Sequence, residues 1–116
     1  MSLSTAKTRD YPKVDPRRGV NYLKFIGNLS YTIANEDKGQ VLLFKDATII
    51  TVAALSVPIG SQIDIIAMGG STPSFIADTG VTLNSKAGAV TLADRFSGAT
   101  LIMTAPSEWT LIGDLI

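Results

Sequence analysis

The chain has 116 residues, a length typical of one compact domain with at most a short appendage. Apolar residues make up 46% of the sequence and charged residues 17%, which supplies a core and excludes general disorder. Cysteine and histidine are both absent, so a disulfide framework and a thiolate metal site are excluded and the commonest catalytic base is missing. We therefore expect no enzymatic activity, no catalytic residues, no metal and no cofactor.

The first 28 residues are polar and basic. They hold six cations and two acids, a net charge of +4, whereas residues 29–116 carry a net charge of −4. Pro12 and Pro16 bias the residues before them toward extended geometry, and no helical or strand period is visible. We predict an extended basic N-terminal arm over residues 1–28, followed by a β-sandwich module over residues 29–116.

Targeting and membrane signals are missing from this sequence. The first seven residues contain no apolar stretch of the kind that a signal peptide needs, so we expect synthesis in the cytoplasm. The longest apolar runs fall far short of the roughly 20 residues of a membrane helix, so we expect no membrane partner.

After the arm, short β-rich runs alternate with Gly, Pro, Asn and Asp, the spacing typical of all-β domains. The predicted strands cover residues 41–45, 48–52, 61–67, 74–77, 81–84, 89–92, 99–104 and 109–112, with residues 22–26 as a further candidate. A single helical turn is expected at residues 34–38. The fold class is therefore all-β, a small antiparallel β-sandwich or barrel-like module with an extended N-terminal arm.

Alternation within the runs predicts which side chains face the core. Ile63 and Ile65 share one face of their strand, and Ala99, Leu101 and Met103 share one face of theirs. No window repeats at a fixed period, which argues against a solenoid or a propeller.

Acidic residues are the only candidates for acid or base chemistry. Most of them fall in turns, where Asp is favoured for its hydrogen bonds to the backbone. Asp64 interrupts an apolar strand, so a pocket with two convergent acids, for example one that involves Asp64, would be needed for a small enzyme with paired carboxylates.

The arm offers candidate contact residues for a partner: Tyr11, Lys13, Arg17 and Arg18. Cations in an extended segment suit either an acidic protein surface or phosphates. Because the net charge of the whole chain is zero, we favour a protein partner and expect no nucleic acid.

Trp109 is the sole tryptophan and lies in the last predicted strand, next to Leu111 and Ile112. Large aromatic residues anchor cores and subunit interfaces. We predict that Trp109, Leu111 and Ile112 form an oligomer interface, while a sugar-stacking role for Trp109 remains open.

The order of features from Tyr31 to Asp114 resembles a β-module found in bacteriophage capsid decoration (cement) proteins, head fibres and tail fibres. The segments that carry the resemblance are residues 37–42, 49–52, 57–63, 69–70, 75–77, 80–85, 91–93, 99–102 and 108–114. The resemblance implies a structural protein of the virion and brings no catalytic residue with it. Decoration proteins of this kind are commonly homotrimers, so the resemblance also implies that state.

A single module with a short arm and no stalk favours a decoration protein over a fibre. We expect a capsid cement protein on the outer surface of the head, whose arm contacts the major capsid protein and stabilises the joints between shell subunits. The alternative is a tail-fibre or head-fibre module that binds a host-surface glycan.

Overall fold

The computed structural model describes residues 22–116. These residues form nine strands and two short 3-10 turns, with no α-helix among them and therefore none that could cross a membrane. The strands are β1 (Leu23–Ile26), β2 (Ser30–Thr32), β3 (Val41–Phe44), β4 (Ile49–Val52), β5 (Gln62–Ala67), β6 (Ser74–Ala77), β7 (Thr82–Ser85), β8 (Gly98–Ala105) and β9 (Glu108–Gly113), and the turns are η2 (Asn35–Asp37) and η3 (Lys86–Gly88). The expected all-β class is confirmed.

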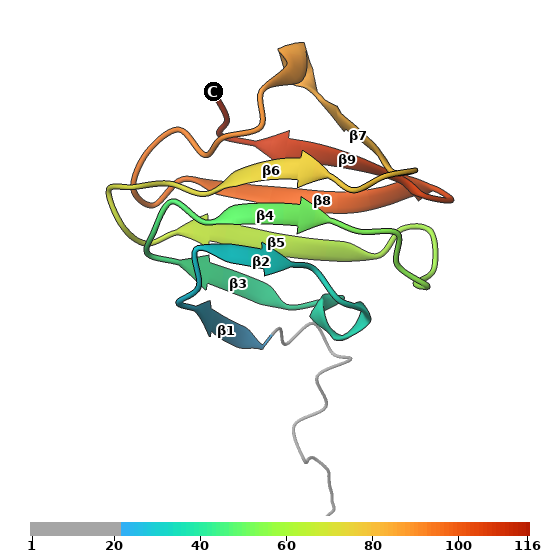
Figure 1. Cartoon of the computed structure of the whole chain (residues 1–116), viewed down its shortest axis with the longest axis horizontal. Helices are drawn as coiled ribbons and strands as arrows, with labels where there is room; N and C mark the ends of the chain where they lie inside the picture. Colours follow the sequence, from blue (N-terminus) through green and yellow to red (C-terminus); the bar gives the residue numbers. More distant parts are fainter. Residues whose placement is uncertain (1–21) are drawn as a thin grey trace, which may run out of the picture.

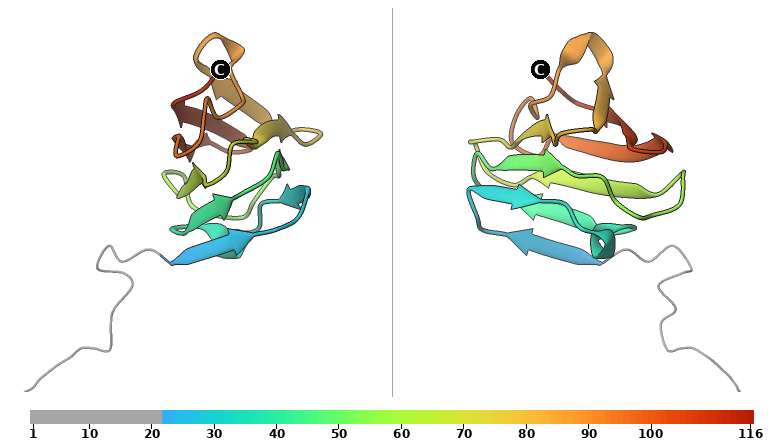
Figure 2. Two further views of the ribbon diagram at one scale, coloured as in Figure 1. Left: turned by 90° about the vertical axis from the view of Figure 1, so that its left-hand side faces the viewer. Right: turned by 45° about the vertical axis from the view of Figure 1, so that its right-hand side comes forward.

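The strands make two sheets. The larger sheet has six strands in the order β1-β3-β5-β8-β9-β7, and the smaller sheet has three in the order β2-β4-β6. The smaller sheet lies across one face of the larger one, as Figures 1 and 2 show from three directions. One face of the six-stranded sheet is thereby covered by β2, β4 and β6.

The chain builds the first part of this arrangement by stacking equivalent turns. It passes from the large sheet to the small one three times, in the pairs β1 and β2, β3 and β4, and β5 and β6. Each strand pairs in parallel with its counterpart in the next turn. The antiparallel sandwich or barrel that the sequence predicts is therefore wrong in its pairing, because only β8 runs against its neighbours β5 and β9. The stacking is solenoid-like (Figure 1).

The successive turns differ in length, and this difference hides the stacking from a search for repeats. Leu23 pairs with Val41, 18 positions later, while Val41 pairs with Asp64, 23 positions later. In the smaller sheet, Ser30 pairs with Ile49 and Ile49 with Ser74, offsets of 19 and 25 positions. Our argument against a solenoid relied on a fixed period, which parallel stacking does not require.

The core lies between the two sheets. Alternate residues of the six-stranded sheet point into it, among them Leu42, Phe44, Ile63, Ile65 and Trp109, and all five are fully buried. The smaller sheet contributes Ile50, Val52 and Phe75. The predicted inward faces of β5 and β8 are confirmed, since Ala99, Leu101 and Met103 are buried as well.

Several local predictions are corrected by tertiary pairing. Residues 89–92 form no strand, and only Thr91 and Leu92 make isolated bridges. β2 was not predicted, because three residues carry little pattern, and its pairing with β4 is what makes it a strand.

The expected helical turn is present as η2. β1 lies within residues 1–28 but is paired to β3, so residues 23–26 belong to the sheet.

Gly69 follows β5 at a point where two backbone segments meet. A Cβ built on Gly69 would lie 2.2 Å from the backbone oxygen of Lys45, whereas one built on Gly70 would meet nothing within 4 Å. We expect Gly69→Ala to lower the free energy of unfolding by about 1–3 kcal/mol, because the clash involves backbone that cannot rotate away. Gly70→Ala is the matched control and should change it little. Chemical denaturation measures both, and equal stabilities would contradict the close approach.

Trp109 is completely buried, and its indole Nε1 finds no hydrogen-bond acceptor among residues 22–116. Trp109→Ala should therefore lower the free energy of unfolding by about 3–5 kcal/mol by leaving a cavity. Trp109→Phe should cost clearly less, because it removes an unpaired donor together with part of the ring. Thermal and denaturant unfolding of the two variants would test this order, and a costlier Phe variant would indicate that Nε1 has a partner.

Candidate binding surface

The outer face of the six-stranded sheet is the face that points away from the smaller sheet. Because side chains alternate along a strand, the neighbours of the core residues Leu42, Ile65 and Leu111 lie on this face. The strand register places these outward residues in rows. One row runs Leu23, Val41, Asp64, Thr100 and Ile112, and the next runs Phe25, Leu43, Ile66 and Gly98.

These two rows are mainly apolar. We call their six large aliphatic and aromatic residues the apolar patch: Leu23, Phe25, Val41, Leu43, Ile66 and Ile112. Three of them are strongly exposed, Leu23 at 64%, Phe25 at 67% and Ile112 at 51%, while Leu43 is buried beneath its neighbours. Contiguous exposed apolar surface of this kind is typical of interaction sites.

The other half of the outer face is mainly polar. Its row joins Gln62, Ile102, Thr110 and Asn84. Hydrogen bonds link side chains there, from Asn84 Nδ2 to Glu108 Oε2 at 2.8 Å and between the hydroxyls of Thr104 and Thr110 at 3.0 Å. The apolar patch is thus confined to one half of the face.

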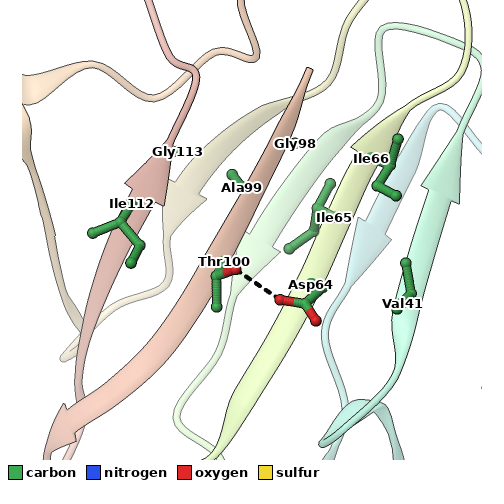
Figure 3. A pocket seen from close by; sticks show the side chains of 9 residues that line it. All are labelled: Val41, Asp64, Ile65, Ile66, Gly98, Ala99, Thr100, Ile112 and Gly113. Atoms are coloured by element: carbon green, nitrogen blue, oxygen red, sulfur yellow. Dashed lines mark hydrogen bonds between the residues drawn. The ribbon is translucent and has the colours of Figure 1, made fainter. Parts of the chain in front are cut away.

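A shallow depression crosses the apolar patch near its centre (Figure 3). Within it, the Thr100 hydroxyl donates to Asp64 Oδ1 at 2.7 Å. Asp64 is the only titratable side chain among the residues that line the depression. The second carboxylate that our enzyme hypothesis needs is therefore not present in this depression.

A cluster of polar side chains connects β1, β2 and η2, which make up the first turn of the stack. Asp37 is fully buried and accepts hydrogen bonds from Lys24 Nζ at 3.1 Å, from the Tyr31 hydroxyl at 2.7 Å and from the backbone N–H of Ala34 at 2.9 Å. Lys24 Nζ also donates to the Tyr31 hydroxyl at 3.1 Å. Because Lys24 is on β1, Tyr31 on β2 and Asp37 in η2, this cluster fixes the three elements relative to one another.

The predicted interface residues do not share one environment. Trp109 and Leu111 are buried in the core of the single chain, and Ile112 lies on the outer face within the apolar patch. Only Ile112 of the three could therefore contact a second molecule without rearrangement. The predicted arm contacts Tyr11, Lys13, Arg17 and Arg18 lie outside the described residues.

Sequence reasoning missed most of the apolar patch. One signal was available in β3, where four apolar residues follow one another without alternation. Such a run indicates a strand that is covered on both faces. In agreement, the side chains of Leu42, Leu43 and Phe44 are all buried although they point to opposite sides of the sheet.

Comparisons of the chain with protein-family models and with curated proteins give no match.

The Lys24, Tyr31 and Asp37 cluster predicts a loss of stability at alkaline pH. The hydrogen bond to Tyr31, and then that to Asp37, hold the pKa of Lys24 above its usual range, and burial raises the pKa of Tyr31. A pKa raised by folding stabilises the folded state below the unfolded value, and this contribution is lost as pH rises past it. We expect the free energy of unfolding to fall from about pH 10 upward.

Urea denaturation between about pH 8 and pH 11 measures this effect. Tyr31→Phe keeps the ring, whose centroid lies 6.1 Å from that of Phe44, but removes the phenol. It should flatten the alkaline fall in part, since Lys24 still titrates beside Asp37. A wild-type stability that stays constant over this range would contradict the assigned cluster.

Proposed function

We propose that this protein is a decoration protein of a bacteriophage capsid. It binds the outside of the head shell and stabilises the contacts between major capsid proteins. The observation that carries a binding role is the apolar patch, an exposed apolar sheet face on a domain that is otherwise packed around one core. The choice of a capsid rather than another assembly rests on the resemblance of residues 31–114 to the phage module.

Charge separation supports contact through the N-terminal residues. Residues 1–21 hold five cations and two acids, and residues 22–116 hold five cations and eight acids, which gives net charges of +3 and −3. The cationic segment favours a partner with an acidic surface, and the zero net charge of the whole chain disfavours nucleic acid. In our proposal Tyr11, Lys13, Arg17 and Arg18 contact the shell.

The mechanism is multivalent. In a homotrimer, three N-terminal segments engage neighbouring shell subunits at once, so the second and third contacts form at a high effective concentration. Modest contacts by each copy then add up to tight binding, and the trimer links subunits that would otherwise separate.

A second candidate function, glycan binding by a fibre module, is favoured by one observation. Phe96 lies in the loop before β8, is 66% exposed, and has the Arg95 guanidinium 5.0 Å from its ring centroid. Exposed aromatic rings with adjacent polar groups are a common way to bind sugars. Host-surface glycan binding that is lost in Phe96→Ala would favour this function over the decoration role.

Co-sedimentation with capsid shells that lack the native protein tests the leading proposal. We expect saturable binding by the full-length chain and loss of binding by a chain that starts at Gly19. A sharper variant replaces Arg17 and Arg18 by Gln, and the matched control replaces the exposed Lys45 and Lys86, which changes the net charge equally. Only the first pair should weaken binding, and its difference from the wild type should shrink as salt is raised, because salt screens the contacts that Arg17 and Arg18 make.

Equal weakening by both pairs would mean that net charge rather than the N-terminal segment determines binding. No sedimentation of the full-length chain would contradict the decoration role.

A further inference from the structure

We infer that the apolar patch is the surface through which copies of this chain associate. The inference deepens the proposed function and rests on it for the oligomeric assembly, but it places the contact on residues that, apart from Ile112, the sequence did not indicate. It moves the interface from the buried Trp109 and Leu111 to the outer face of β1, β3, β5 and β9, where Ile112 is already exposed.

The parallel pairing of strands in the six-stranded sheet predicts that its outer face is covered as well as its inner face. β1, β3 and β5 pair in parallel, and parallel sheets are normally covered on both faces. The smaller sheet covers the inner face, whereas no described residue covers Leu23, Phe25 or Ile112 on the outer face. The outer face of the smaller sheet contrasts with it, because Ser30, Thr32, Thr51 and Ser74 supply hydroxyls there beside Ile49 and Ile76.

The chemistry of the apolar patch disfavours the shell-binding residues as its occupant. The two rows that contain the apolar patch hold one charged side chain, Asp64, whose carboxylate already accepts a hydrogen bond from Thr100. A surface with one charge among aliphatic side chains suits another apolar sheet face rather than a cationic peptide. A second copy of this chain carries such a face with the same side chains.

The edge strand β1 adds a second reason for a neighbouring copy. The backbone N–H of Val41 donates to the oxygen of Tyr22, so Tyr22 directs its backbone groups toward β3. Because successive residues of a strand direct them to opposite sides, Leu23 and Phe25 direct theirs away from β3, where no described strand lies. Exposed edges are usually protected by charge, proline or a cover. The Lys24 charge is held by Asp37 and does not protect this edge, which favours a neighbouring molecule on the β1 side of the apolar patch.

The homotrimer of the proposed function requires two different contact regions on each copy, because a cyclic trimer joins its copies head to tail. The apolar patch has two ends that can serve as these regions. Phe25 lies on β1 and Ile112 on β9, and β3, β5 and β8 lie between those two strands.

Two isoleucines provide a matched test of the full-length protein. Ile112 is 51% exposed on the outer face of the large sheet, and Ile76 is 50% exposed on the outer face of the small one. We expect light scattering after size exclusion to give about three chains for the wild type and for Ile76→Asp, and one chain for Ile112→Asp. Circular dichroism confirms that each variant is folded. A monomeric wild type, or an Ile112→Asp variant of unchanged mass, would overturn the inference.

Cysteine labelling gives an independent measurement, because the chain has no cysteine of its own. Ile112→Cys should react with a maleimide several-fold more slowly than Ile76→Cys, and adding Phe25→Asp should abolish the difference. Protection of Ile112→Cys in a monomer would mean that residues 1–21 cover the apolar patch, and protection only on capsid shells would mean that the capsid protein does. Either result would overturn the inference.

These measurements separate the inference from the proposed function. An oligomer that depends on Ile112 but does not bind shells would remove the decoration role and leave the self-association surface in place. A monomer that binds shells would remove the self-association surface and leave the decoration role in place.

Discussion

Parallel register between successive turns is the constraint on which the rest of this structure depends. It places core residues one above another, so that Leu42 lies beside Ile65 in the large sheet and Ile50 beside Phe75 in the small one. Every turn then buries its apolar side chains against both the opposite sheet and the turn next to it. The buried Asp37 cluster stabilises the first described turn, which has one neighbouring turn among residues 22–116. Hydrophobic burial is thus distributed along a stack rather than around a centre.

The same alternation that fills the core also produces the apolar patch. In a half-exposed sheet, outward positions are usually polar, as they are on the rows that hold Gln62, Thr110 and Asn84. The rows that hold Phe25 and Ile112 break this rule on one half of the face. The single chain therefore exposes apolar surface area to water, and association would bury that area. We regard that local departure as the strongest structural argument for a protein that acts by assembling.

The sequence was most informative about features that depend on residues close together in the chain. Alternation around Ile63 and Ile65 identified their inward face, because a period of two needs only a few residues to be visible. Pairing direction could not be read in this way, since the offset from Leu23 to Val41 differs from that between Val41 and Asp64. The position of Trp109 was also undetermined by its sequence context, because an indole suits a core and an interface equally. Asp64 stood out because it interrupts an apolar strand, but its hydrogen-bond partner Thr100 lies 36 positions away and is brought to it only by the antiparallel pairing of β5 with β8.

The two ends of the stack are not equivalent. Beside β6, the chain returns on itself, with Ser74 bridged to Thr91 and the N–H of Phe75 bonded to the oxygen of Val90. Beside β1 and β2, the described chain offers two free edges in line with each other. A module with open edges at both ends could polymerise without limit by adding turn upon turn. With one end of the small sheet closed by its own chain, the described part of this module presents aligned free edges of both sheets on one side only, which disfavours unlimited edge-to-edge growth.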